Sequence, residues 1–314
     1  MDREIAAVAS GRGPIVVGPW LAEVGYEALY WVPFVRWFQD RFGIPPDRLH
    51  VLSRGGVDAW YSGVAGHYVD IFDLMAPEEL AERNAARRSE DERGGQKQST
   101  LSALDQVLLT RFAERTGCDI SAVCHPSLMF NVFRHVWHHN LAFDFLWRRT
   151  RYERVALPAV PLPGLPSAPY TAVKLYSGMA IPPSDENRRA LASLVRRAAA
   201  TSPVVLLDAD VPFDEHLNIE VGALPNVVSD RSAMTPRNNL GIQSAVVAGA
   251  SQFIGTCGGL AWLAPMLGVP TVAVYEDDRL LDVHMMVARQ VYKRIKAAPF
   301  THVDLRAWRL LGME

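Results

Sequence analysis

Residues 254–275 read IGTCGGLAWLAPMLGVPTVAVY, and the order of apolar and small residues in this stretch indicates the fold class. An apolar run ends in five consecutive small residues, GTCGG at 255–259, and a second apolar run follows them. The pattern predicts a buried parallel strand that turns directly into a helix, with another strand at 270–276. Adjacent glycines at such a turn let an anion approach the backbone amides at the start of the helix. The turn therefore predicts either a diphosphate site or a tight strand–helix connection without a ligand.

The composition limits the class of protein. The chain has 314 residues, of which 49% are hydrophobic and 21% charged, with a formal net charge of −2. This length favours two domains, and the near-neutral balance argues against a nucleic-acid binder. Cys118, Cys124 and Cys257 have no CxxC spacing, so neither a disulfide framework nor a zinc knuckle is expected.

The location of the protein is predicted from what its sequence lacks. Residues 1–13 contain no apolar run of the length found in signal peptides, and no run of about 18 apolar residues occurs in the chain. We therefore expect a cytoplasmic protein with no transmembrane segment.

Strands and helices alternate along both halves, which indicates parallel α/β layers. In the first half, strands are expected at 14–20, 48–53 and 68–75, with helices at 26–43 and 101–117. In the second half, strands are expected at 171–177, 203–210, 226–230, 252–256 and 270–276, and helices at 184–200, 239–250, 260–268 and 302–312.

Five prolines in residues 156–169 mark the expected domain boundary, because proline favours extended chain and disrupts helices. We predict a first domain at 1–160, a linker at 161–169, a second domain at 170–290 and a helical tail at 291–314 that packs back. Residues 82–100 are polar and highly charged, which favours a flexible surface loop or the frayed end of a helix.

Residues 238–278, NNLGIQSAVVAGASQFIGTCGGLAWLAPMLGVPTVAVYEDD, resemble the C-terminal half of glycosyltransferases with the GT-B fold. They are most similar to the heptosyltransferase and bacterial O-antigen-type branches, in which a Gly-rich turn precedes a segment like LGVPTVAVY. The resemblance covers residues 170–280 well and the first half only by layout. It implies an α/β fold of two facing Rossmann-like domains, with a nucleotide-sugar donor mainly on the second domain and the acceptor on the first.

The donor site implied by this resemblance lies at strand ends of the second domain. An ammonium at Lys174 can neutralise the diphosphate as the sugar leaves, or it is a solvent-facing strand lysine. Asn238, Asn239 and Gln243 begin the helix before the Gly-rich turn, where they bind phosphate or ribose, or cap the helix, as is favoured for Asn238. The candidate donor residues are Lys174, Tyr176, Ser177, Asn239, Gln243, Thr256, Cys257, Gly258 and Gly259.

The resemblance also implies a base in the loop after the first strand. Glu23 lies there beside Trp20 and Leu21, and apolar neighbours raise the pKa of a carboxyl toward neutrality. Glu27 is the alternative one turn further on, as an acid favoured by the helix dipole. His125, which follows a predicted strand, is a third candidate for the base. The aspartate that heptosyltransferases carry in this loop is missing.

We therefore expect an inverting, metal-independent glycosyltransferase that moves a sugar from a nucleoside-diphosphate sugar to an acceptor hydroxyl of a glycan, a lipid-linked sugar or a small molecule. No metal or other cofactor is expected. The DAD sequence at 208–210 resembles a metal-binding pattern, but chance or loop capping explains it. The alternatives are a nucleotide-sugar epimerase on the same fold and a non-catalytic GT-B-like binding protein.

Overall fold

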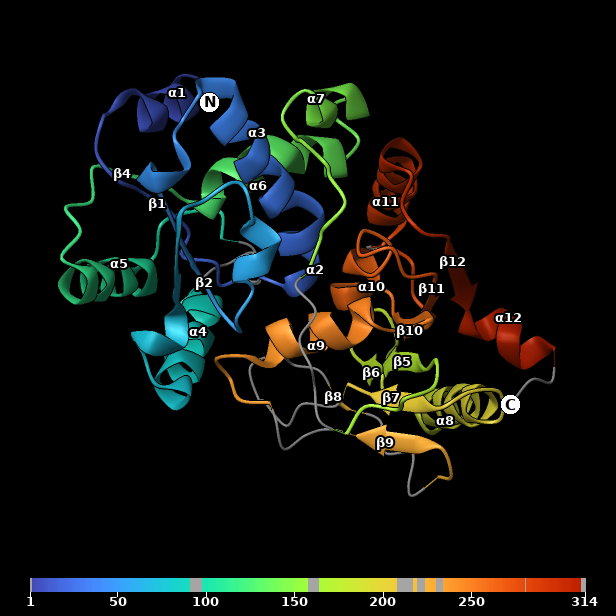
Figure 1. Ribbon diagram of the computed structural model, residues 1–314. Coiled ribbons are helices and arrows are strands. Elements are labelled where there is room, and N and C mark those ends of the chain that lie inside the picture. The colour runs from blue at the N-terminus through green and yellow to red at the C-terminus, as the bar shows by residue number, and fades with distance from the viewer. Residues whose placement is uncertain are drawn as a thin grey trace. The chain divides into compact units, whose positions relative to one another are not determined.

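The computed structural model divides the chain into two compact units (Figure 1). Unit 1 comprises Met1–Tyr152 with Thr235–Gly241, and unit 2 comprises Glu153–Met234 with Ile242–Glu314. The structure describes residues 2–90, 98–157, 164–207, 217–218, 224–229, 234–279 and 281–311. The residues just before the Pro-rich segment already belong to unit 2, since the amide of Val155 donates to the carbonyl of Met266 at 3.0 Å. The prolines indicate where the chain is extended. The boundary between the units depends instead on tertiary hydrogen bonds such as that from Val155 to Met266.

Unit 1 is built on a parallel sheet of order β3-β2-β1-β4. Its strands are β1 (Ile15–Val17), β2 (Leu49–Ser53), β3 (His67–Asp70) and β4 (Ala122–Cys124). The chain leaves β1 toward β2 and β3 and later returns to its other side at β4. The connections therefore reverse direction between β1 and β4, which makes this the topological switch point of unit 1.

Helices cover both faces of this sheet, with α4 and α5 on one side and α3 and α6 on the other (Figure 1). The helical segments are α1 (Asp2–Ser10), α2 (Val24–Tyr26), η1 (Glu27–Trp31), α3 (Val32–Phe42), η2 (Pro46–Arg48), η3 (Asp58–Tyr61), η4 (Ile71–Asp73), α4 (Pro77–Glu90), α5 (Ala103–Thr116), α6 (Pro126–Trp137) and α7 (Phe143–Trp147). On the α5 side, Leu108 and Phe112 pack with Val16 and Leu52. On the other side, Trp20 stacks on Trp31 with ring centroids 5.6 Å apart.

The helix predicted at 26–43 is interrupted at its start. Residues Glu27–Trp31 form a π-helical turn before Pro33, which stands in the first turn of α3. Proline has no backbone N–H to donate and its ring clashes with a preceding helical turn, so it is unfavourable inside a helix. It is tolerated in the first turn of α3, where a new helix begins. The helix ends at Gly43 in the left-handed conformation, as the sequence indicates.

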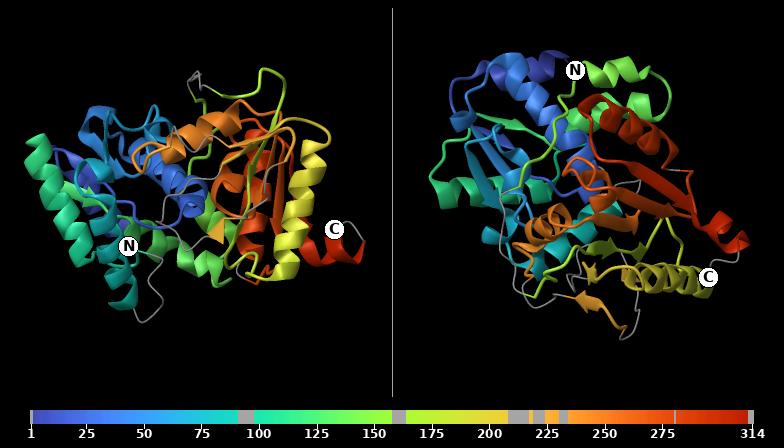
Figure 2. Two further views of the ribbon diagram at one scale, coloured as in Figure 1. Left: turned by 90° about the horizontal axis from the view of Figure 1, so that it is seen from below. Right: turned by 45° about the vertical axis from the view of Figure 1, so that its right-hand side comes forward.

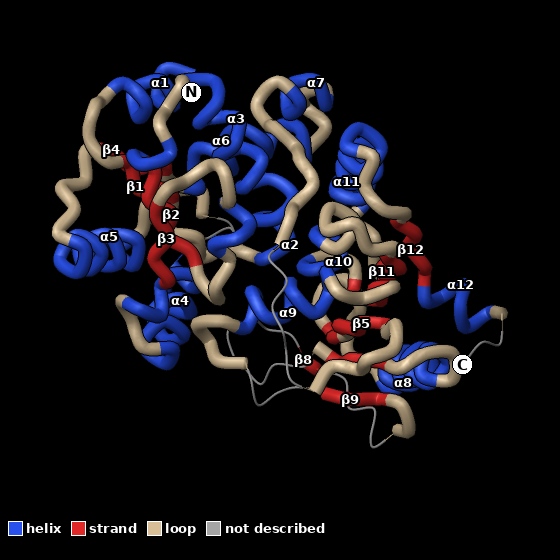
Figure 3. The backbone as a smooth tube through the Cα atoms, viewed as in Figure 1, coloured by secondary structure: helices blue, strands red, loops and turns tan. Residues whose placement is uncertain are grey.

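Unit 2 holds a parallel sheet of order β12-β11-β10-β5-β7-β9, and Figure 3 draws its strands in red. The strands are β5 (Thr171–Lys174), β7 (Val204–Leu206), β9 (Val227–Ser229), β10 (Gln252–Thr256), β11 (Thr271–Tyr275) and β12 (Phe300–Asp304), and a separate antiparallel ribbon joins β6 (Tyr176–Ser177) to β8 (Leu217–Asn218). The chain runs from β5 outward to β9 and then returns to the other side of β5 at β10. The switch point of unit 2 therefore lies between β5 and β10.

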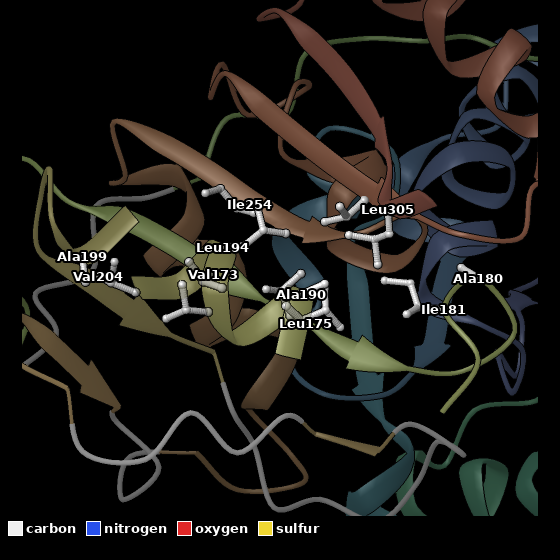
Figure 4. Packing of buried hydrophobic residues seen from close by; sticks show 13 residues of the cluster. Val173, Leu175, Ala180, Ile181, Ala190, Leu194, Ala199, Val204, Ile254 and Leu305 are labelled. Atoms are coloured by element: carbon white, nitrogen blue, oxygen red, sulfur yellow. The ribbon is translucent and has the colours of Figure 1, made fainter. Parts of the chain in front are cut away.

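The helices of unit 2 are α8 (Asp185–Ala199), α9 (Asn239–Ala248), α10 (Gly259–Leu263), α11 (Asp282–Ile295) and α12 (Leu305–Leu310). α12 packs beside α8, and aliphatic side chains of both, including Leu194 and Leu305, meet Val173 and Ile254 of the sheet (Figures 2 and 4). Burying each such side chain contributes about 1.5–3 kcal/mol. The predicted α/β class is confirmed in both units.

The strand expected at 68–75 ends at Asp70, the helix expected at 260–268 ends at Leu263, and two further segments differ from the sequence prediction. Residues 82–90, expected in a flexible loop or a frayed helix end, form the second half of α4. Acidic residues begin this helix, basic residues end it, and Glu79 pairs with Arg83 one turn on, all of which favour helix. Residues 300–304, expected within a helical tail, form β12 on the edge of the sheet beside β11. None of the helices in the described ranges has the length and apolar character that a membrane crossing requires.

Candidate functional site

The switch point of unit 2 brings the Gly-rich turn and the end of β5 together. The Thr256 hydroxyl accepts a hydrogen bond from the Tyr176 amide and donates one to the Tyr176 carbonyl, both at 3.0 Å. This hydroxyl ties the chain that follows β5 to the carboxyl end of β10. The carboxyl edge at a switch point is where ligands bind in open α/β sheets.

The turn itself requires glycine. Gly258 has φ 125° and ψ −171°, a conformation that is essentially restricted to glycine, and Gly259 has φ 44°. A Cβ built on Gly259 would lie 3.5 Å from the hydroxyl of Tyr176, and one on Gly258 would lie 3.6 Å from it. The Tyr176 hydroxyl therefore lies close to both glycines. A ligand bound against the glycine backbone would be within reach of this hydroxyl.

Two residues of the turn, Thr256 and Cys257, make hydrogen bonds within unit 2. The amide of Cys257 donates to the carbonyl of Val274 at 2.8 Å, and its buried thiol has a pKa raised by burial to about 12. The thiol is therefore neutral at physiological pH. The hydroxyl of Thr256 is engaged by Tyr176 as described above. Within the predicted turn, Gly258 and Gly259 are thus the positions suited to a ligand.

The other predicted donor residues lie in different surroundings. Lys174 ends β5, is half-buried and stands in register with Gly255, which places it at the switch point. Ser177 is buried in the β6–β8 ribbon. Gln243 is buried on the part of α9 that belongs to unit 2. Asn239 belongs to unit 1, where its side-chain amide donates to the carbonyl of Pro236 at 2.9 Å. Asn239 is therefore not part of the unit that contains the Gly-rich turn.

At the carboxyl edge of unit 1, Glu23 stands at the N-cap position of α2 and is half-buried. Its carbonyl accepts from the amides of Tyr26 and Glu27 at 3.1 and 3.2 Å, so its backbone is fixed at the helix start. The pKa of Tyr26 is raised first by burial and then by the charge of Glu23. The Glu23 carboxylate thus lies close to a phenol at the end of the loop that follows β1.

Glu27 is enclosed in the interior of unit 1. Its Oε1 accepts from the Ser53 hydroxyl at 2.6 Å and from the Tyr61 hydroxyl at 2.7 Å, and the residue is 0% exposed. Burial raises the pKa of Glu27 to about 7, although both hydrogen bonds and the charge of Arg54 oppose the shift. An enclosed carboxyl cannot touch an acceptor hydroxyl, so this geometry suits Glu27 to a role inside the protein.

His125 is held by a hydrogen bond at one ring nitrogen and lies close to a carboxylate at the other. It caps α6, where Nδ1 accepts from the amide of Ser127 at 3.1 Å. The proton of a neutral ring is therefore on Nε2, which lies 3.4 Å from Oδ2 of Asp105. This buried histidine is part of an internal pair with Asp105, which argues against its use as the acceptor base.

Two buried polar residues of unit 1 are missing from the sequence-based candidates. Asp105 closes a capping box with Ser102, a pattern that the spacing of these two residues shows. Gln98 hydrogen-bonds the loop after β1, and nothing in its polar sequence neighbourhood indicates burial.

No protein-family model and no curated protein matches the chain. Among solved structures, it is similar to the iron-containing dodecameric glycosyltransferase TibC from enterotoxigenic E. coli, with 17% identity over 84% of this chain and a TM-score of 0.45. The chain spans 58% of the length of TibC. It is also similar to a family 9 glycosyl transferase from Veillonella parvula, with 13% identity, a TM-score of 0.45 and coverage of 96% of this chain and 88% of that one.

A third similar structure is the E. coli heptosyltransferase WaaC with ADP, at 14% identity and a TM-score of 0.42, covering 95% of this chain and 98% of that one. A putative UDP-N-acetylglucosamine 2-epimerase from Listeria monocytogenes is similar at 12% identity and a TM-score of 0.37, covering 96% of this chain and 95% of that one. These structures include the enzyme class that residues 238–278 resemble. Their identities and TM-scores are too low to determine a function, which is therefore argued from the site.

From the resemblance to GT-B glycosyltransferases, no metal or other cofactor is expected, and this expectation is wrong. TibC, a similar glycosyltransferase, contains iron. The Gly-rich turn and the LGVPTVAVY segment carry the resemblance, and neither reports on a metal bound elsewhere. Within the described parts of the chain, no group of three or more His, Cys, Asp or Glu side chains is placed to hold a metal ion. Asp208 and Asp210 lie outside those parts.

Proposed function

We propose that the chain is a glycosyltransferase that moves a sugar from a nucleoside-diphosphate sugar to an acceptor hydroxyl, with inversion at the anomeric carbon. The observation that carries this proposal is the Gly258–Gly259 turn, over which the Tyr176 hydroxyl stands, at the switch point between β5 and β10. The carboxyl edge at a switch point is the general ligand position of open α/β sheets, and bare glycine backbone suits phosphate oxygens.

The donor diphosphate would lie against the amides of Gly258 and Gly259. Lys174, half-buried at the end of β5, supplies positive charge as the leaving diphosphate gains negative charge. The Tyr176 hydroxyl can donate to the same oxygens, because it stands over the two glycines. The neutral thiol of Cys257 takes no part in this chemistry.

The acceptor side is assigned to Glu23 of unit 1. Its carboxylate would accept the proton of the acceptor hydroxyl while the acceptor oxygen attacks the anomeric carbon and the nucleoside diphosphate leaves. One displacement on the face opposite the leaving group inverts the anomeric centre. Glu23 is half-buried as a residue, whereas Glu27 and His125 are buried. This difference supports Glu23 over the other two candidates.

A nucleotide panel tests the donor site first. UDP, GDP, dTDP and ADP are titrated into the protein by calorimetry, with and without Mg²⁺ and Fe²⁺, and a Gly259→Asp variant is compared with Gly43→Asp. Gly43 also has a positive φ, 58°, and open space around its Cβ position, so both variants carry a similar backbone cost. We expect nucleotide binding to be lost only in Gly259→Asp, because its carboxylate repels the diphosphate. Equal affinity in both variants would remove the turn from the site.

Turnover separates the reaction classes. The protein is incubated with sugar nucleotides and a panel of glycans, lipid-linked sugars and small alcohols, and free nucleoside diphosphate and the anomeric configuration of products are measured. Acceptor-dependent release with an inverted product supports the proposal. A changed sugar nucleotide without an acceptor indicates an epimerase, and binding without any turnover indicates a non-catalytic protein.

A further inference from the structure

We propose that Gln98 is a positioning residue: its buried side chain fixes the loop between β1 and α2 and thereby the backbone that presents Glu23. The inference rests on the proposed function, in which Glu23 accepts the proton. Gln98 is 1% exposed. Its Oε1 accepts from the amide of Leu21 at 2.8 Å, and its Nε2 donates to the carbonyl of Pro19 at 2.9 Å. One side chain thus holds the loop at two positions that flank Trp20.

The neighbouring positions of the loop are held by the sheet. The amide of Gly18 donates to the carbonyl of Cys124 on β4, and the amide of Trp20 donates to the carbonyl of Leu52 on β2, each at 3.0 Å. Positions 18 and 20 therefore use strand backbone, whereas positions 19 and 21 use Gln98. The loop leads from this point to Glu23, so a change at Gln98 is transmitted to the start of α2.

An ionised carboxylate orients the amide of Gln98. Nε2 of Gln98 also donates to Oδ1 of Asp105 at 3.1 Å, and Asp105 is 0% exposed. Burial opposes ionisation of Asp105, but hydrogen bonds from His125 and Ser102 outweigh it and lower the pKa of Asp105. A carboxylate accepts and cannot donate, so it fixes which end of the Gln98 amide faces it. The oxygen of Gln98 is thereby directed at Leu21.

His125 connects this arrangement to the other strand of the switch point. It follows β4 directly, and its protonated Nε2 lies 3.4 Å from Oδ2 of Asp105. The amide and hydroxyl of Ser102 also donate to Oδ2, at 2.7 and 2.6 Å. Gln98, Asp105 and His125 therefore form one buried network from the start of α6 to the loop after β1. Within this network the His125 ring faces the buried Asp105, which suits it to support and not to the role of an acceptor base.

The test compares Gln98→Leu with Gln39→Leu. Gln39 lies in the same unit, and its Nε2 donates to the carbonyl of Ile44 at 2.8 Å near the end of α3. Both variants thus lose side-chain to backbone hydrogen bonds, but only Gln98→Leu loses those of the β1 loop. Three quantities are measured: amide hydrogen exchange of the peptide covering residues 18–23, nucleotide affinity, and kcat for sugar transfer.

In Gln98→Leu we expect faster exchange in residues 18–23 and a fall in kcat of about 10–100-fold, because small displacements of catalytic groups are costly. Nucleotide affinity should be unchanged, since the donor site is assigned to unit 2. Gln39→Leu should keep exchange in residues 18–23, affinity and kcat at wild-type values. Should Gln98→Leu not fold, Gln98→Asn, which keeps the amide on a shorter side chain, replaces it with the same expectations.

If amide exchange in residues 18–23 of Gln98→Leu equals that of the wild type, Gln98 does not anchor the loop. If exchange is faster but kcat stays at the wild-type value, Gln98 anchors the loop but does not position Glu23. A wild-type protein that neither binds nucleotides nor transfers sugar refutes the proposed function instead. The exchange measurement still decides whether Gln98 anchors the loop in that case, so the two failures are distinguishable.

Discussion

The Thr256 hydroxyl and the Tyr176 backbone form a two-way bridge, in which the hydroxyl accepts from the amide and donates to the carbonyl at 3.0 Å each. Two segments 80 residues apart in sequence are joined by this one side chain. The bridge fixes the backbone of Tyr176, the first residue of β6, and therefore the position of its hydroxyl close to Gly258 and Gly259. The geometry of the candidate donor site depends on it.

Thr256→Val should destabilise unit 2 and weaken nucleotide binding. Valine has the shape of threonine but leaves the buried Tyr176 amide without its partner, which costs about 1–3 kcal/mol of unfolding free energy. Thr256→Ser retains the hydroxyl and should retain most of both properties. Urea unfolding and nucleotide titration measure the two effects.

The control is Thr171→Val, at the amino end of β5, where the hydroxyl bonds to that of Ser202 at 2.9 Å. This variant should lose stability without losing nucleotide affinity. If both valine variants bind nucleotides as the wild type does, the bridge has no part in the donor site.

The sequence was sufficient to predict the strand–turn–helix at 252–263, because the period of apolar residues and the paired glycines are local signals. It did not reveal the partner of Thr256. Strand order places β10 beside β5, and only that order brings Thr256 to Tyr176. The placement of Lys174, Gly258 and Gly259 at a switch point is therefore a property of the fold, which local patterns do not contain.

The acceptor side was harder to predict for a related reason. Glu23 and Glu27 are four residues apart in one apolar segment, and the sequence does not distinguish their environments. Burial separates them: Ser53 and Tyr61 enclose Glu27, whereas Glu23 stands at a helix start. The role of Gln98 depends on contacts with residues 77 and 79 positions away, which no local pattern carries.

Glu27→Gln should remove a pH dependence of stability. The folded-state pKa of Glu27 is about 7, above the 4.5 of an ordinary glutamate, because the carboxyl is buried. The folded protein therefore binds this proton more tightly than the unfolded chain does. The resulting stability is fully present below about pH 4.5 and is lost as the pH rises through 7, a change on the order of 3 kcal/mol.

Glutamine is neutral at every pH in this range. The free energy of unfolding of Glu27→Gln, measured by urea unfolding at several pH values, should therefore lack the decrease between about pH 4.5 and 7 that Glu27 causes in the wild type. Glu114→Gln, at an exposed position of α5, should keep the wild-type slope. A wild-type slope in Glu27→Gln would show that Glu27 is ionised in the folded protein at neutral pH.

Arg309→Met should release α12 from α8. The guanidinium donates to Oε1 of Glu276 at 2.6 Å and pairs with Glu186 at 3.0 Å, and its side chain is 14% exposed. Its loss should lower the unfolding free energy by about 1–3 kcal/mol and speed proteolysis of the tail. Arg306→Met removes an exposed pair with Asp304, at 52% side-chain exposure, and should have little effect. Equal losses in the two variants would contradict a specific clamp at Arg309.

Glu23→Gln should lower the rate of sugar transfer about 10²–10⁴-fold, the usual contribution of a positioned general base. Glutamine keeps the size of the side chain and cannot accept the proton, and nucleotide affinity should persist because the donor site is assigned to unit 2. Steady-state kinetics and calorimetry measure the two quantities. His125→Gln provides the contrast: as a member of the buried network with Asp105, it should lower stability as well as rate. A near-normal rate in Glu23→Gln, with a steep loss in His125→Gln at unchanged stability, would transfer the base to the histidine.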